Sequence, residues 1–228
     1  MTTVYGYNTE WYDHIISLYK THEIRLKKIR EEMKSVKYRY DDIEAEITCL
    51  IIMDTKPSVL KEFSPCGGWS TNYIIRACED TCKIESFDSN STCMTNVHVP
   101  NWTFTQGDVK EHFARMVIEK PKYLFIKSDH SREFTKIYIE ELLEKLVGTG
   151  IIVSVHDVFH SQEPSEEGVI ILNFLKKYNI AYFTPTNKTH LHNLVDVKMS
   201  MGVGDLAHLS WNNPTPYKQA NPSIFFKL

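Results

Sequence analysis

The sequence predicts an α/β protein whose strands form a parallel, doubly wound sheet. From Ser58 onward, short apolar runs of strand length alternate with amphipathic stretches of helical length. Seven runs are expected to be strands: Val59–Phe63, Ile84–Phe87, Trp102–Thr105, Tyr123–Ile126, Ile151–His156, Ile180–Thr184 and Ser223–Lys227. The stretches expected to be helices lie near residues 69–79, 109–119, 132–147 and 165–178. Strands that alternate with helices pair in parallel, with helices on both faces of the sheet.

Two helices are expected before the first strand. Apolar residues recur at alternating intervals of three and four from Trp11 to Met33, which is the spacing of one face of a long amphipathic helix. A second helix is expected to begin at Asp41 or Asp42 and to end at Lys56, because a proline follows.

The chain is expected to divide into a helical extension, residues 1–56, and an α/β domain, residues 57–228. The extension is a candidate lid or oligomer arm. Its apolar stripe is expected to pack either against the domain or against a partner subunit, and in the second case the protein forms a homo-oligomer.

Composition and charge exclude several classes of partner. The net charge of -3 and the pI near 6.4 argue against a protein that binds nucleic acid or an anionic membrane. No apolar run reaches the roughly 20 residues that cross a bilayer, and the N-terminus lacks a signal-peptide pattern. The cysteines show no paired framework, which indicates reduced thiols. We therefore expect a cytoplasmic protein.

Candidate ligand-binding residues lie in the loops that follow the strands. In an open α/β sheet, ligands bind beyond the carboxyl ends of the strands, where the strand order reverses. The loop after the first strand contains Gly67 and Gly68 and runs into a helix, so its N–H groups can approach a ligand closely. Asp88 ends the second strand, where a carboxylate can accept hydrogen bonds from both hydroxyls of a ribose. Asp108 ends the third strand. The alternative interpretation is that both acids cap helices.

Three blocks of the sequence together resemble one known family: Glu62–Thr71, Phe125–Ser131 and Gly148–Val158. Their order and spacing are similar to those of the class I S-adenosylmethionine (SAM)-dependent methyltransferases, especially the branch of sugar and antibiotic O-methyltransferases. The resemblance covers residues 57–178 and implies a Rossmann-like sheet, mostly parallel with an antiparallel last strand. The chain departs from the family at Ser64 and Cys66, where glycines are more usual.

The resemblance implies SAM as the cofactor and assigns residues to it. Glu62 and Gly68 line the methionine side of the cofactor, Asp88 holds the ribose, and Asp108 meets the adenine. The other cofactor-binding residues that the resemblance implies are Ser64, Gly67, Ser70 and Thr71.

Asp129, His156 and Asp157 follow the fourth and fifth strands. Several related O-methyltransferases bind Mg²⁺ with acids at these positions, so the resemblance implies a divalent cation, Mg²⁺ or Mn²⁺, at these three residues. It also implies that Asp129 or His156 is the catalytic base that takes the acceptor's proton. Lys127 stands where an acid is common. It would repel the ion, or it would neutralise Asp157 and make a metal unnecessary, and both alternatives stay open. His130 is expected either to face the cleft or to cap the next helix.

The resemblance predicts an enzyme that transfers a methyl group to a hydroxyl of a sugar or glycan, with rhamnose-like deoxysugars as one acceptor class. One alternative is another small hydroxylated metabolite as the acceptor. A second alternative is a non-catalytic binding module that keeps the methyltransferase fold. RNA is a less favoured acceptor, because the sequence contains no stripe of basic residues that would bind it.

Overall fold

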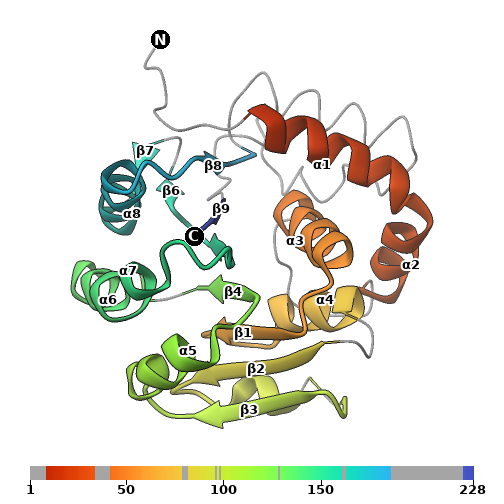
Figure 1. Ribbon diagram of the computed structural model, residues 1–228. Helices are drawn as coiled ribbons and strands as arrows, with labels where there is room; N and C mark the ends of the chain where they lie inside the picture. The colour runs from red at the N-terminus through yellow and green to blue at the C-terminus, as the bar shows by residue number, and fades with distance from the viewer. Residues whose placement is uncertain are drawn as a thin grey trace.

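The computed structural model describes residues 9–33, 42–78, 82–95, 97, 99–127, 129–160, 163–185 and 223–228. These residues form a 7-stranded sheet with helices on both faces (Figure 1). The strands are β1 (Val59–Phe63), β2 (Lys83–Asp88), β3 (Trp102–Gln106), β4 (Tyr123–Ile126), β5 (Ile152–Val155), β8 (Tyr182–Phe183) and β9 (Ile224–Lys227).

The strand order in the sheet is β3-β2-β1-β4-β5-β9-β8. The five strands from β3 to β5 pair in parallel, and β9 is antiparallel to both β5 and β8. This arrangement confirms the predicted Rossmann-like sheet with its antiparallel last strand. The order reverses at β1, which lies between β2 and β4, so the switch point lies at the carboxyl end of β1.

Helices cover both faces of this sheet (Figure 1). They are α1 (Thr9–Thr21), α2 (Glu23–Met33), α3 (Asp42–Thr55), α4 (Trp69–Cys78), α5 (Phe113–Glu119), α6 (Arg132–Tyr138), α7 (Glu144–Leu146) and α8 (Glu166–Lys177). Two short 3₁₀ helices are η1 (Thr92–Thr95) and η2 (Val109–His112), and a π-helical turn, η3 (Ile139–Leu143), joins α6 to α7. One apolar core lies under α1–α4 and the other under α5–α8.

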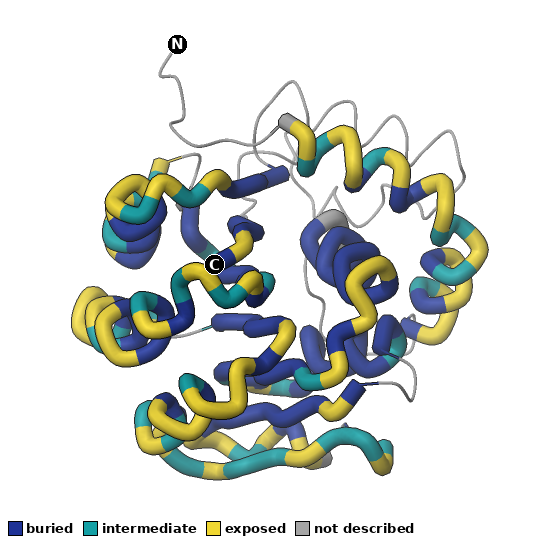
Figure 2. Tube along the Cα trace, in the orientation of Figure 1, coloured by how far each residue is buried: buried dark blue, intermediate teal, exposed yellow. Residues whose placement is uncertain are grey.

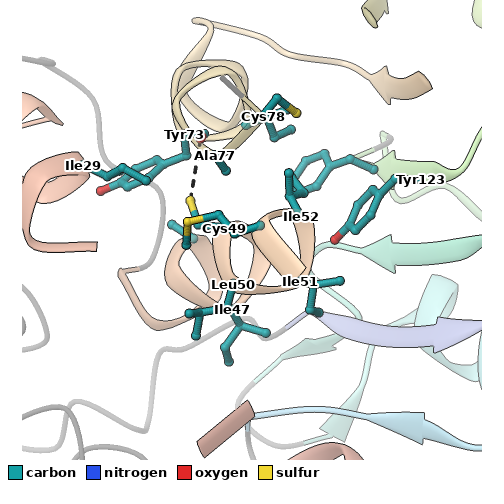
Figure 3. Close-up of a cluster of buried hydrophobic side chains, with 14 of the residues drawn as sticks. Ile29, Ile47, Cys49, Leu50, Ile51, Ile52, Tyr73, Ala77, Cys78 and Tyr123 are labelled. Carbon is teal, nitrogen blue, oxygen red and sulfur yellow. Dashed lines mark hydrogen bonds between the residues drawn. The ribbon is translucent and has the colours of Figure 1, made fainter. Parts of the chain in front are cut away.

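Helix α3 is buried from Glu44 to Met53, whereas α1 and α2 expose their outer sides (Figure 2). Figure 3 shows α3 packed between α4 and the sheet, with Cys49 against α4 and Ile52 near Tyr123. The Cys49 thiol donates a hydrogen bond to the carbonyl oxygen of Tyr73 at 3.6 Å. The last helix of the N-terminal segment is therefore one layer of the α/β core. No described helix is long and apolar enough to cross a membrane.

The N-terminal apolar stripe belongs to two helices instead of the single long helix predicted. A turn at His22 separates α1 from α2, although backbone hydrogen bonds continue through it. The Thr21 hydroxyl donates to the carbonyl of Ser17 at 3.0 Å, a contact that commonly bends helices. Members of the stripe such as Ile15, Leu18 and Leu26 are buried within this chain.

A short hairpin follows β5 that sequence reasoning missed. Its strands are β6 (Phe159–His160) and β7 (Glu163–Pro164), and it leads directly into α8. Ser165 caps α8: its hydroxyl accepts the N–H of Gly168 at 3.0 Å and lies 3.0 Å from the carbonyl of Val158. The hairpin and the cap fix the loop after β5 against the start of α8.

Candidate functional site

The loops at the carboxyl edge of the sheet contain non-glycine residues with left-handed backbones. Ser64 and Cys66 have φ values of 53° and 50°, and they occupy the positions where the family carries glycines. His130 and Asp157, after β4 and β5, have φ values of 60° and 58°. Left-handed conformations of this kind cost free energy and cluster at functional sites.

Glu62 is fully buried and anchors the first loop. Its carboxylate accepts hydrogen bonds from the hydroxyls of Ser70 (2.6 Å), Thr71 (2.8 Å) and Ser86 (2.6 Å). Burial raises the pKa of Glu62, and these three hydroxyl donors partly oppose that rise. The side chains of Ser70 and Thr71 thus hold the start of α4 against β1. Direct contact of Glu62, Ser70 or Thr71 with a cofactor stays a prediction.

At Gly68 the loop after β1 passes close to Val97 and Cys93. The φ of Gly68 is 81°, and a Cβ there would lie 2.9 Å from the side chain of Val97 and 3.5 Å from Cys93. Only glycine fits both the conformation and the space. Gly67 and Ser64 are half-buried beside it, and the N–H of Ser64 donates to the carbonyl of Phe87 at 2.7 Å.

Asp88 connects the loop after β1 to the end of β2. One carboxylate oxygen accepts the N–H of Cys66 at 3.0 Å and the other accepts the N–H of Asn90 at 2.9 Å. Each oxygen keeps a lone pair for a second donor, so the carboxylate fits the two hydroxyls of a ribose. Contact of Asp88 with a ribose stays a prediction.

Asp108 is exposed and caps η2. Its carboxylate accepts the N–H of Lys110 at 3.0 Å and lies 3.0 Å from the ammonium of the same residue. Burial raises the pKa of Asp108, but the hydrogen bonds and the charge of Lys110 together outweigh burial and lower that pKa. This geometry supports the capping interpretation, and the adenine contact stays a prediction.

His156 and Asp157 form a pair after β5. Nδ1 of His156 lies 2.9 Å from Oδ2 of Asp157, and Nε2 lies 3.5 Å from Oε2 of Glu44 on α3. The His156 side chain is 12% exposed, and its burial lowers its pKa although the nearby carboxylate of Asp157 raises it. Glu44 also accepts the N–H and the hydroxyl of Ser223, at 2.9 and 2.6 Å. A neutral imidazole therefore lies among polar side chains between β5, β9 and α3.

His130 faces two carboxylates. Its Nδ1 lies 2.6 Å from Oε2 of Glu167, and its Nε2 lies 3.4 Å from Oδ2 of Asp157. The other oxygen of Glu167 accepts the hydroxyl of Tyr138 at 2.6 Å. Burial lowers the pKa of His130, but hydrogen bonds to the two carboxylates outweigh it and raise that pKa to about 9. His130 is therefore an imidazolium between the carboxylates of Asp157 and Glu167, while Ser131 caps α6.

The predicted metal ligands do not fit a divalent ion. Asp157 already faces His130 and His156, and their hydrogen bonds hold its pKa well below the usual range even though burial raises it. Asp129 is exposed, and its Oδ1 accepts the N–H of Ser131 at 2.9 Å. Within the described part of the chain, no group of three or more His, Cys, Asp or Glu side chains has the geometry to hold a metal.

Sequence reasoning missed Glu44, Glu167 and Tyr138, which shape this half of the site. Glu44 lies in a helix with many apolar residues, and a charged residue on the buried side of such a helix indicates a buried partner. That signal was available. The roles of Glu167 and Tyr138 depend on how α6 packs beside α8, which local patterns do not reveal.

Solved structures with the same fold include O-methyltransferases. The O-methyltransferase from Bacillus cereus, in complex with S-adenosylhomocysteine (SAH), is 11% identical with a TM-score of 0.58, and the alignment covers 90% of each chain. The O-methyltransferase TomG from Streptomyces achromogenes, involved in tomaymycin synthesis and in complex with SAM, is 8% identical. Its TM-score is 0.51, with 90% of this chain and 87% of that chain covered.

The sequence matches no protein-family model and no curated protein. At the identities above, the structural likeness shows the fold. It confirms the Rossmann-like fold that the resemblance implied.

Proposed function

We propose that this protein is a SAM-dependent O-methyltransferase that methylates a hydroxyl group of a small molecule. The observation that carries the proposal is the position of Asp88, which tethers the left-handed loop after β1 and keeps lone pairs for a ribose. Across the switch point from it lies a neutral histidine paired with Asp157, a candidate base for the acceptor. The fold shared with O-methyltransferases supports this combination.

The first half of the site would hold the cofactor. Asp88 would accept hydrogen bonds from the ribose, and the loop around Gly68 would offer backbone N–H groups at the start of α4. Glu62 keeps that loop in place through its three hydroxyl contacts. When bound, SAM supplies a methyl group on a sulfonium, whose C–S bond breaks as the acceptor oxygen forms the new C–O bond.

The second half would handle the acceptor's proton. Oδ2 of Asp157 lies 2.9 Å from Nδ1 of His156, and Nε2, on the other side of the ring, is the nitrogen that would accept the hydroxyl proton. The Glu44 carboxylate, 3.5 Å from Nε2, stabilises the imidazolium that forms. General-base catalysis of this kind contributes about 10²- to 10⁴-fold in rate. Asp129, the other candidate base, is exposed at the edge of the site.

Sugar and glycan hydroxyls are the first acceptors to test, because the sequence blocks resemble the sugar and antibiotic branch. Other small hydroxylated metabolites are the second class. Methyl transfer from labelled SAM to a panel of both classes separates them, and His156→Ala is expected to lose activity toward any acceptor while it retains SAH binding.

The cofactor assignment is tested by calorimetric titration of the protein with SAH. We expect micromolar binding in the wild type and a loss of at least tenfold in affinity for Asp88→Asn. Asp54→Asn removes another carboxylate, one paired with His14 on the surface, and is expected to bind SAH normally. Asp108→Asn keeps a capping side chain, so any loss of affinity in this variant reports contact with the adenine. Absence of SAH binding in the wild type would favour a non-catalytic binding module.

A further inference from the structure

His130 occupies a position that its backbone does not favour. Its φ of 60° and that of Asp157, 58°, both lie in the left-handed region, and together they bring the two side chains toward each other across the ends of β4 and β5. Strained conformations persist where the surrounding structure holds them. Here Glu167, which is fully buried, and the hydroxyl of Tyr138 fix the far side of the His130 ring.

Both ring nitrogens of His130 face carboxylate oxygens. An imidazole can donate a proton from both nitrogens only as the cation. The 2.6 Å hydrogen bond from Nδ1 to the buried Glu167 carboxylate favours the charged ring, so one positive charge lies between the carboxylates of Glu167 and Asp157, where the His130 side chain is 27% exposed. Oδ2 of Asp157 also faces His156, so the same oxygen joins the cation to the candidate base.

We propose that the His130 cation takes the place of a divalent metal ion in this site, so that Asp157 is neutralised and aligned against His156 without a metal. His130 is thus a positioning residue, which acts on the acceptor's proton through Asp157 and His156. The link to methyl transfer rests on the proposed function, but the exclusion of the metal rests on the charges and contacts alone. Lys127, at the end of β4, adds a second positive charge that repels a divalent ion.

The test is a titration of the chelator-treated full chain with Mn²⁺, followed by electron paramagnetic resonance. We expect no protein-bound Mn²⁺ in the wild type at millimolar concentration. His130→Gly removes the cation and suits the left-handed backbone, so it is expected to bind Mn²⁺ at least tenfold more tightly than the wild type. Added imidazole is expected to displace that Mn²⁺. His130→Asn, which also tolerates a positive φ, is expected to behave like His130→Gly.

Lys120→Gly is the matched control, because Lys120 is an exposed residue with a φ of 48° outside the site. It is expected to leave Mn²⁺ binding unchanged. Wild-type binding of Mn²⁺ that Asp157→Asn abolishes would overturn the proposal, as would folded His130→Gly and His130→Asn variants that bind no Mn²⁺. SAH titration of the same samples tests the proposed function separately. A failure to bind SAH would contradict that function, whereas the Mn²⁺ titration alone would still show whether His130 excludes a metal ion.

Discussion

Ser64 and Cys66 adopt left-handed backbone conformations at two loop positions where glycine is more usual in the resembled family. Both adopt φ values that glycine takes freely, and each is expected to cost about 1–3 kcal/mol relative to a relaxed backbone. Tethers compensate this cost: the N–H of Cys66 donates to Asp88, and that of Ser64 donates to Phe87. The departure from the family pattern at these positions therefore changes the side chains and keeps the backbone.

A glycine at position 66 should stabilise the protein. Cys66→Gly relieves the left-handed strain and keeps the N–H that Asp88 accepts, so we expect a gain of about 0.5–1 kcal/mol in the free energy of unfolding. Urea denaturation measures it. Cys66→Ala removes the same thiol but keeps the strain, and a glycine variant no more stable than the alanine variant would show that the loop is not strained.

The charge of His130 should make stability depend on pH. Its pKa is raised from 6.5 to about 9 in the folded protein, mainly because the hydrogen bonds to Asp157 and Glu167 outweigh burial. A raised folded-state pKa contributes stability that is fully present below pH 6.5 and is lost as the pH rises through 9. We expect a loss of about 1–3 kcal/mol across this window. Denaturation of the wild type and of His130→Asn between these pH values measures it; equal slopes for the two proteins would contradict the assignment.

At the scale of elements, the junction between β5 and α8 sets the position of Asp157. Gly168 lies so close to the carbonyl of Val158 that an added Cβ would approach its oxygen to 2.1 Å. The capping hydroxyl of Ser165 lies 3.2 Å from the carbonyl of Asp157 as well. Helix α8 thus fixes the turn that carries Asp157, besides supplying Glu167 to the site.

Substitution of Gly168 should disturb this junction. Gly168→Ala forces the helix away from Val158, and we expect a loss of about 1–3 kcal/mol in the free energy of unfolding. Thermal unfolding measures the loss. Val169→Ala changes the neighbouring, 49% exposed residue and should remain within about 0.5 kcal/mol of the wild type. A Gly168→Ala variant as stable as Val169→Ala would mean that α8 does not constrain the turn.

At the scale of the whole molecule, the N-terminal helices are bound to the body by buried polar contacts. Arg30 on α2 pairs with Glu46 on α3, and the hydroxyl of Tyr19 on α1 donates to the same carboxylate at 2.9 Å. Glu46 and Tyr19 are buried, so this cluster ties three helices together inside the protein. Helix α3 also supplies Glu44 to the site.

Loss of Arg30 should therefore weaken the whole fold. Arg30→Met leaves the buried Glu46 carboxylate without its cation, and we expect a cost of about 3–5 kcal/mol. Arg30→Met with Glu46→Gln should recover part of that loss. Lys27→Met breaks an exposed pair on the same helix and should cost about 0.5 kcal/mol or less. Chemical denaturation compares the three variants, and equal costs for Arg30→Met and Lys27→Met would contradict a role for the cluster.

Periodicity was sufficient to predict the sheet, because buried parallel strands are nearly continuous apolar runs; β1 and β4 have the predicted bounds. The bend at His22 and the hairpin after β5 depend on single side-chain contacts and on tertiary packing, which periodicity does not report. In the site, the position of Asp88 followed from its strand. The contacts of His130 could not be predicted, because they depend on how α8 and α6 pack beside the ends of β4 and β5.

The most direct test of the central claim is an experimental structure of the protein crystallised with SAH. The account predicts the nucleoside at the carboxyl ends of β1 and β2, with the ribose hydroxyls donating to Asp88. SAH bound away from Asp88, or crystals that remain free of SAH at saturating concentration, would contradict it.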